Sequence, residues 1–223
     1  MIDFHAHILP GADHGSDGLE TSLAQLRLAE RAGVDTVIAT PHFYPQTEEI
    51  DAFLERRLAS WQQLCAAYHG PVRLMLGAEV QMCPGLDHMD ELEKLCIEGT
   101  NILLLELGFM GWPHSVGESV IRLNDSGEYC PVLAHIDRYN ADRIDDLLSC
   151  GVLAQLNADA FTRLWGKGRL ISWIDSGSVV ALGSDIHGTV RGYRNFEKTR
   201  TYLKDRFDTV MDRTDSLLTE HKR

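Results

Sequence analysis

Short apolar runs alternate with amphipathic segments along the whole chain. Seven of these runs have the length of strands, and they span residues 2–8, 34–41, 72–80, 101–108, 131–136, 152–157 and 179–185. Apolar residues at helical spacing lie between and after them, at about residues 19–33, 47–68, 86–98, 116–126, 141–150, 164–175, 191–207 and 210–221. Strands that are apolar on both faces indicate a parallel sheet covered by helices. The pattern therefore predicts an α/β fold of seven βα units in a distorted (β/α)7 barrel, with an open doubly wound sheet as the alternative.

Histidines gather in the first predicted strand and in the turn after it. His5 and His7 are two residues apart, so their side chains share one face of the strand, and His14 follows a turn at Pro10 and Gly11. A single histidine here would be interpreted as a satisfied polar residue at a strand end. Three of them within ten residues favour a binding site for a divalent metal.

Residues able to bind a metal also lie at the ends of the other predicted strands or directly after them. They are His42, Glu79, Glu106, His135, Asn157, Asp159, Asp185 and His187. In an α/β barrel the C-terminal ends of the strands converge on one face, so we expect these side chains to meet there. The sequence thus predicts a metal site at the C-terminal strand ends. The remaining histidines are interpreted as solvated or loop residues: His69, His88, His114 and His221.

Nine of these residues are the candidate metal ligands. They are His5, His7, His14, His42, Glu79, Glu106, His135, Asp185 and His187. Nine ligands are too many for one ion, but a carboxylate can bridge two ions, so the set suits two or three. Imidazole and carboxylate ligands without a thiolate fit manganese, iron or zinc, and we place manganese first.

Composition narrows the class of protein. The net charge is −12 and no run of Lys and Arg appears, which argues against a nucleic-acid partner. No segment has the length and apolarity of a membrane span, and no signal peptide is recognisable. The five cysteines are odd in number and form no C-x-x-C pair, and none is followed six residues later by the arginine of a cysteine-dependent phosphatase. We expect one cytoplasmic domain over residues 1–223 with reduced thiols; the oligomeric state stays open.

Together these residues resemble the PHP (polymerase and histidinol phosphatase) superfamily over almost the whole chain. The resemblance rests on His5-Ala6-His7, Thr40-Pro41-His42, Gly77-Ala78-Glu79, Ala134-His135 and Ser184-Asp185-Ile186-His187. Within the superfamily the sequence is most similar to the bacterial CpsB/YwqE-type protein-tyrosine phosphatases. Residues 2–11, 77–79, 134–138 and 155–157 carry that similarity. The phosphatases usually have D-D-G where this chain has Asp13-His14-Gly15. The histidine at the second of these positions resembles other PHP branches.

The resemblance implies a grouping of the ligands and a substrate. A first ion would be held by His5, His7, Glu79 and Asp185, a second by Glu79, Glu106 and His135, and a third by His14, His42 and His187. The implied activity is hydrolysis of protein phosphotyrosine, on the tail of a tyrosine kinase of capsule or exopolysaccharide biosynthesis. Direct insertion into a membrane is not expected.

Hydrolysis of a phosphate ester needs a nucleophile and neutralisation of charge. A hydroxide bridging two ions would attack phosphorus, because a metal lowers the pKa of a bound water. Arg138 and Arg191 are candidates to clamp the phosphoryl oxygens; the alternative is that they form surface salt bridges. Asp3, Asn157 and Asp159 are candidates to orient the ligand imidazoles. A phenol is a tolerable leaving group, so an aryl ester needs a dedicated general acid less than an alkyl ester does.

Two other functions fit the same residues. One is hydrolysis of histidinol phosphate or of another small phosphoester by a PHP enzyme. The other is a non-catalytic, metal-binding regulatory domain. A survey of phosphoester substrates together with metal analysis would discriminate among the three.

Overall fold

A computed structural model describes residues 1–109, 111–163, 166–188 and 192–222 of the chain. Its strands are β1 Ile2–Ala6, β2 Thr36–Ala39, β3 His42–Phe43, β4 Arg73–Leu76, β5 Glu79–Gln81, β6 Ile102–Glu106, β7 Cys130–Leu133, β8 Leu153–Asn157 and β9 Val179–Gly183. All of their pairings are parallel. They form a three-stranded sheet, β1-β2-β4, and a six-stranded sheet, β3-β5-β6-β7-β8-β9. The predicted α/β fold with parallel strands is confirmed.

The two sheets adjoin because two of the predicted strands are each interrupted once. The strand predicted for residues 34–41 extends to Phe43 and divides into β2 and β3, and residues 72–80 give β4 and the start of β5. Pro41 lies in the first break and has no N–H to donate to a ladder. Hydrogen bonds from Gly77 N to Ala39 O (2.8 Å) and from Glu79 N to Pro41 O (3.1 Å) cross the break. The pairing of β2 with β4 therefore leads directly into the pairing of β3 with β5.

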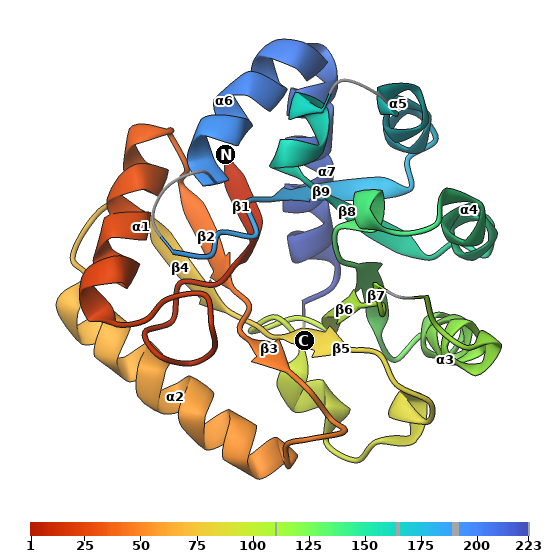
Figure 1. Ribbon diagram of the computed structural model, residues 1–223, viewed down its shortest axis with the longest axis horizontal. Helices are drawn as coiled ribbons and strands as arrows, with labels where there is room; N and C mark the ends of the chain where they lie inside the picture. Colours follow the sequence, from red (N-terminus) through yellow and green to blue (C-terminus); the bar gives the residue numbers. More distant parts are fainter. Residues whose placement is uncertain (110, 164–165, 189–191, 223) are drawn as a thin grey trace.

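The first and last strands also lie side by side. Asp185 N donates to His5 O at 2.8 Å, and Ala6 forms an isolated parallel bridge with Ile186. In Figure 1 the strands occupy the middle of the molecule with helices around them. The described strands nevertheless form two hydrogen-bonded sheets, so one closed seven-stranded barrel remains a prediction.

Seven α-helices appear in the described residues. They are α1 Leu19–Arg31, α2 Ile50–Ala67, α3 His114–Asp125, α4 Ala141–Ser149, α5 Lys167–Asp175, α6 Gly192–Leu203 and α7 Asp205–Glu220. Helix α7 lies behind the strands in Figure 1. Its Thr214 Oγ1 donates to Val180 O at 2.7 Å, near the start of β9. Helix α7 therefore packs at the amino-terminal end of the strands, away from the predicted metal site.

The helix predicted for residues 86–98 is wrong. Two short 3₁₀ helices stand there instead, η1 Leu86–His88 and η2 Leu92–Leu95. Glu91 between them has a φ of 62°, a left-handed conformation that a continuous helix does not permit. Two further 3₁₀ helices, η3 Ile136–Arg138 and η4 Ala158–Thr162, come directly after β7 and β8 and carry candidate site residues.

The central strands are buried on both faces, as covered parallel strands should be. Every residue of β6, β7 and β9 is buried, including the carboxylate-bearing Glu106. Such burial requires that a charged side chain be paired or bound to a cation. None of the described helices combines the length and the apolar character needed to cross a membrane.

Candidate metal centre

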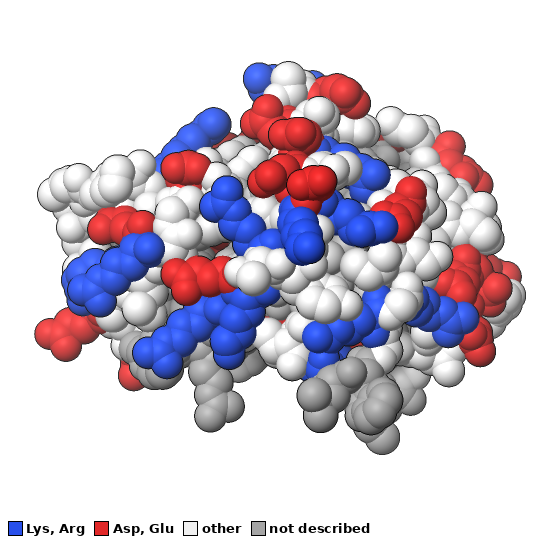
Figure 2. Space-filling model, turned by 90° about the horizontal axis from the view of Figure 1, so that it is seen from above, with Lys and Arg blue, Asp and Glu red and all other residues white. Residues whose placement is uncertain are grey.

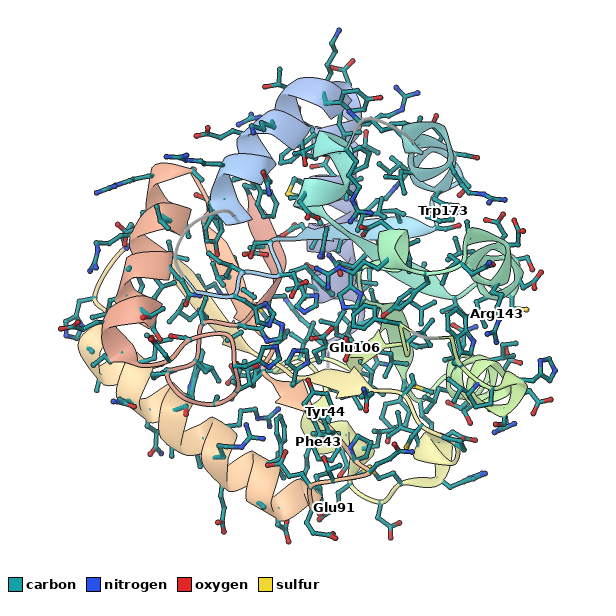
Figure 3. All side chains as sticks on the ribbon, viewed as in Figure 1. Phe43, Tyr44, Glu91, Glu106, Arg143 and Trp173 are labelled. Atoms are coloured by element: carbon teal, nitrogen blue, oxygen red, sulfur yellow. The ribbon has the colours of Figure 1, made fainter. Side chains whose placement is uncertain are left out.

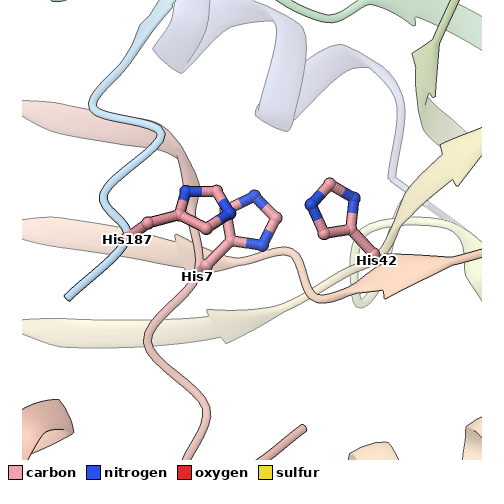
Figure 4. Close-up of side chains that lie close together, drawn as sticks. All are labelled: His7, His42 and His187. Carbon is pink, nitrogen blue, oxygen red and sulfur yellow. The ribbon is translucent and has the colours of Figure 1, made fainter. Parts of the chain in front are cut away.

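Six imidazoles meet at the carboxyl-terminal ends of the strands. They belong to His5, His7, His14, His42, His135 and His187. The ring centroid of His7 lies 4.4 Å from that of His42 and 4.1 Å from that of His187. Figure 4 shows these three rings close together; His7 comes directly after β1, His42 begins β3 and His187 lies in the segment after β9. Residues far apart in the chain thus come together, as expected from their places after the predicted strands.

Glu79 is the central carboxylate of this cluster and is completely buried. Its Oε2 lies 3.1 Å from His5 Nε2, 3.2 Å from His7 Nε2 and 2.9 Å from His42 Nδ1. Its Oε1 lies 2.8 Å from His135 Nε2. One carboxylate that faces four imidazoles through both of its oxygens could contribute to more than one cation site.

Four overlapping groups of described side chains have the spacing needed to hold a cation. They are His7-His42-His187, His5-His7-Asp185, His5-Glu79-His135 and His42-Glu79-Glu106. Within each group the ligand atoms all lie within 4.8 Å of one another. The expected first set is recognisable in the second and third groups. Glu106 joins His42 and Glu79, although its Oε1 is also 3.7 Å from His135 Nε2.

His14 is the candidate ligand that these groups do not contain. Its ring centroid nevertheless lies 4.8 Å from that of His42 and 4.7 Å from that of His187. His7 takes the third place beside His42 and His187 instead. The assignment of individual residues to individual ions therefore stays a prediction.

Two atoms of the cluster are buried without a hydrogen-bond partner. They are His42 Nδ1 and Glu79 Oε2, which lie 2.9 Å apart in a geometry that makes no hydrogen bond. A buried polar atom left without a partner costs about 1–3 kcal/mol. Because both atoms can donate an electron pair and both residues belong to the group His42-Glu79-Glu106, a cation bound there would satisfy both atoms at once.

Two partner residues that the sequence analysis missed fix the orientation of the imidazoles. Asp13 Oδ2 accepts from His7 Nδ1 at 2.7 Å. Gln155 Oε1 lies 3.3 Å from His5 Nδ1 and accepts from His135 N at 2.7 Å. The contacts of Asp13 and Gln155 with Nδ1 leave Nε2 of His7 and His5 facing the carboxylates, which selects the tautomer that a ligand needs.

Tyr139, also missed, is the third such partner. Its Oη lies 3.1 Å from His135 Nδ1 and accepts from Leu107 N at 3.0 Å. Burial, together with the nearby carboxylates of Glu106 and Glu79, raises the pKa of Tyr139, so its hydroxyl keeps its proton. Tyr139 lies one residue beyond Arg138, so the segment after His135 supplies both residues.

Asp3 holds the segment after β9 rather than an imidazole. Its Oδ1 accepts from Ser184 N at 2.7 Å, and its Oδ2 accepts from Ser184 Oγ at 2.6 Å and from Tyr193 Oη at 2.7 Å. Since Ser184 precedes Asp185, Asp3 ties β1 and α6 to the backbone that presents this carboxylate. Asp185 itself has a φ of 49°, and a conformation of this kind costs about 1–3 kcal/mol and persists only where the surroundings enforce it.

Asn157 and Asp159 border the centre from the end of β8. Asn157 Nδ2 donates to Asp185 Oδ2 at 3.0 Å, and Gln155 Nε2 donates to Asn157 Oδ1 at 2.9 Å. Asp159 lines an open pocket of about 400 Å³ beside Asp185 and His187. In the described residues, hydrogen bonds join neither Asn157 nor Asp159 to an imidazole, so their contacts differ from those predicted.

Arg138 is at the edge of the same pocket. Its Nη2 forms an ion pair with Asp185 Oδ2, and a third of its side chain is exposed. A guanidinium at this point can reach an anion that enters the pocket. Arg191, the other predicted arginine, lies outside the described residues.

The electrostatics of the three carboxylates differ. Burial acts to raise the pKa of Glu79, but the imidazoles of His5, His135 and His42 hold that pKa well below its usual range. Asp185 behaves alike, because His5 and His7 outweigh burial in lowering its pKa. Burial and the neighbouring Glu79 raise the pKa of Glu106 to about 8. The imidazoles thus favour the ionised forms of Glu79 and Asp185, while burial beside Glu79 favours the protonated form of Glu106, whose proton a bound cation would displace.

These features, an α/β fold with imidazoles and carboxylates gathered at its strand ends, agree with the comparison with known proteins. The chain belongs to the capsular polysaccharide synthesis, CpsB/CapC, family, whose model matches residues 1–221. Tyrosine-protein phosphatase YwqE of Bacillus subtilis is 26% identical over 174 residues, which are 75% of this chain and 68% of YwqE.

Two solved structures share the fold. One comes from work on YwqE of Bacillus subtilis and CpsB of Streptococcus pneumoniae, described as unique metal-dependent tyrosine phosphatases. It matches with a TM-score of 0.80 and 22% identity over 100% of this chain and 96% of its own. Histidinol phosphate phosphatase of Lactococcus lactis matches with a TM-score of 0.61 and 15% identity, over 92% and 93% of the two chains.

Proposed function

We propose that the protein is a metal-dependent phosphatase that hydrolyses phosphotyrosine in a protein substrate, on a tyrosine kinase of capsule or exopolysaccharide synthesis. The single observation that supports it most is the convergence of His5, His7, His42 and His135 on Glu79, with Glu79 Oε2 and His42 Nδ1 left unpaired. The named activity of YwqE supplies the substrate class.

The residues present fit two or three divalent ions. Nitrogen and carboxylate oxygen donors without a thiolate suit manganese, iron or zinc, and manganese is our first choice. Ions bound there would lower the pKa of a coordinated water and neutralise charge on the phosphoryl group. The ligands proposed to hold them are His5, His7, His14, His42, Glu79, Glu106, His135, Asp185 and His187.

Arg138 has the proposed role of binding the phosphoryl group. Its guanidinium lies at the pocket edge and pairs with Asp185, so an entering phosphate can exchange one anionic partner for another. When Arg138 turns to the phosphate, the hydrogen bond that Asn157 Nδ2 donates to Asp185 Oδ2 keeps the Asp185 carboxylate in place. Arg191 stays a candidate for the same role from the sequence.

The surface beside the pocket suits an anionic protein segment, although the chain has a net charge of −12. Figure 2 shows Lys and Arg side chains collected over the half of this face nearest the residues drawn in grey. Helix α6 exposes Arg194 and Lys198, one residue before and three residues after Asn195, which lines the pocket. A phosphorylated, acidic tail would be attracted to this edge.

The test is release of phosphate from a phosphotyrosyl peptide by the manganese-loaded protein. We expect turnover that is lost in His42→Ala and kept in His88→Ala, since the His88 side chain is 77% exposed and stands outside the cluster. Turnover of histidinol phosphate with none of phosphotyrosine would replace the proposed substrate. A full metal complement without turnover of any phosphoester would indicate a regulatory domain.

A further inference from the structure

Beside the metal centre, one large apolar side chain remains in contact with solvent. Phe109 follows β6 and is 56% exposed, which is unusual among the described apolar residues. Its ring centroid lies 5.6 Å from that of His135, with an interplanar angle of 25°. The ring therefore rests on a proposed metal ligand while more than half of its surface stays accessible.

The chain before Phe109 contacts Tyr139. Leu107 N donates to Tyr139 Oη at 3.0 Å, and the Tyr139 ring stacks on Phe109 at 5.8 Å. Gly111 N donates to Gly108 O at 3.0 Å, which closes a tight turn around Phe109. The ring of Phe109 thus stacks on both His135 and Tyr139, next to a backbone that is hydrogen-bonded at Leu107 and Gly111.

After Phe109, the chain is held by Trp112. This side chain is buried and packs edge-on against Tyr139, with 5.6 Å between ring centroids. Arg143 places its Cζ 4.0 Å from the Trp112 ring centroid and donates from Nη1 to Trp112 O at 2.7 Å. Figure 3 labels Arg143, which belongs to helix α4. Leu107 and Trp112, on either side of Phe109, are therefore both held by contacts with described residues.

Arg138 completes the surroundings of the ring. Its Cζ lies 5.8 Å from the Phe109 centroid, while its Nη2 pairs with Asp185 in the metal cluster. Phe109 is consequently flanked by one group proposed to bind phosphoryl oxygens and by one proposed to bind a metal. An anion held by Arg138 and by a cation bound at His135 would carry its ester substituent close to the exposed ring.

We propose that Phe109 is the platform on which the aromatic ring of the substrate stacks, so that the site selects aryl over alkyl phosphate esters. This inference rests on the proposed phosphatase function. In phosphotyrosine only the ester oxygen separates phosphorus from the ring, so the groups that bind the two must adjoin, as His135, Arg138 and Phe109 do. Offset stacking of two aromatic rings adds to the area they bury.

The experiment measures binding of two non-hydrolysable probes to the manganese-loaded full chain by calorimetry. Phenylphosphonate carries the ring and methylphosphonate does not. We expect Phe109→Ala to weaken phenylphosphonate binding about tenfold and to change methylphosphonate binding less than about twofold. Phe109→Trp should bind both probes with affinities close to those of the unaltered protein. Tyr202→Ala is the matched control, because Tyr202 is an exposed ring on α6, 46% accessible, that contacts Phe161 rather than the cluster.

Two results would overturn the inference. One is an equal effect of Phe109→Ala on both probes, and the other is no preference of the unaltered protein for phenylphosphonate. Because binding is measured without turnover, the outcome is separable from that of the proposed function. A protein that binds phenylphosphonate through Phe109 but releases no phosphate from phosphotyrosine would refute the proposed reaction and keep the platform.

Discussion

Asp13 Oδ2 lies 2.7 Å from Nδ1 of His7, so the imidazole presents Nε2 to Glu79 and Asp185. Asp13 also accepts from the backbone of His42 at 3.0 Å. We expect Asp13→Asn to weaken manganese binding by about 10- to 100-fold, as loss of a ligand's hydrogen-bonding carboxylate commonly does. Calorimetric titration of the metal-free protein measures this directly.

Asp17→Asn is the matched control, since Asp17 is exposed in the same segment and its carboxylate accepts from the hydroxyl of Thr21 rather than from an imidazole. Its metal affinity should match that of the unaltered protein. Equal affinities for the Asp13 and Asp17 variants would show that Asp13 does not orient a ligand.

The sequence could predict the location of the cluster because strand ends are recognisable. His42, Glu79, His135 and Asp185 each come after or at the end of an apolar run, and parallel strands bring such ends to one edge. Site residues inside a strand are harder to recognise from the sequence than those at its end. Gln155 is buried two positions before Asn157, on the same face of β8, and this spacing equals that of His5 and His7 at the end of β1.

Contacts that depend on the path of a loop could not be predicted from the sequence. Tyr139 reaches His135 only because η3 turns the chain back at once after β7, and His135 takes a φ of 35° to allow it. Phe109 stacks on His135 from the loop of a neighbouring strand. The helix predicted for residues 86–98 is interrupted at Glu91, and helix propensity could not predict this break. Glutamate favours helices, and the left-handed φ of Glu91 is imposed by its surroundings.

Gly15 makes a close approach to His7 that no larger residue permits. A Cβ placed there would lie 2.0 Å from His7 Cβ and 2.8 Å from His7 O. Gly15→Ala must therefore displace His7 or the turn, and overpacking of this kind destabilises by about 1–3 kcal/mol. We expect a lower melting temperature and weaker manganese binding. Gly18→Ala is the control, because Gly18 has extended backbone and nothing within 4 Å; an equal effect of both changes would contradict the steric cause.

Removal of metal should destabilise the protein, since the cluster binds cations only when folded. At a manganese concentration about 100 times the dissociation constant, the stabilisation is about 2.7 kcal/mol. For a chain of this size each kcal/mol corresponds to a shift of roughly 2–4 °C, so chelation should lower the melting temperature by about 5–10 °C. Scanning calorimetry with and without chelator measures the shift. In His42→Ala the shift should shrink, and an unchanged shift in that variant would place the ions elsewhere.

Charge reversal on helix α6 should slow capture of an acidic phosphopeptide. Arg194 and Lys198 are exposed beside the pocket-lining Asn195, so Arg194→Glu with Lys198→Glu reverses the local field. We expect kcat/KM for an acidic phosphotyrosyl peptide to fall several-fold at low salt. The difference should vanish near 1 M salt, where the screening length is about 3 Å. Arg73→Glu is the control, because Arg73 is exposed at the start of β4, the opposite end of the strands from the cluster. A loss that persists at high salt, or an equal loss in Arg73→Glu, would show that the α6 surface does not steer the substrate.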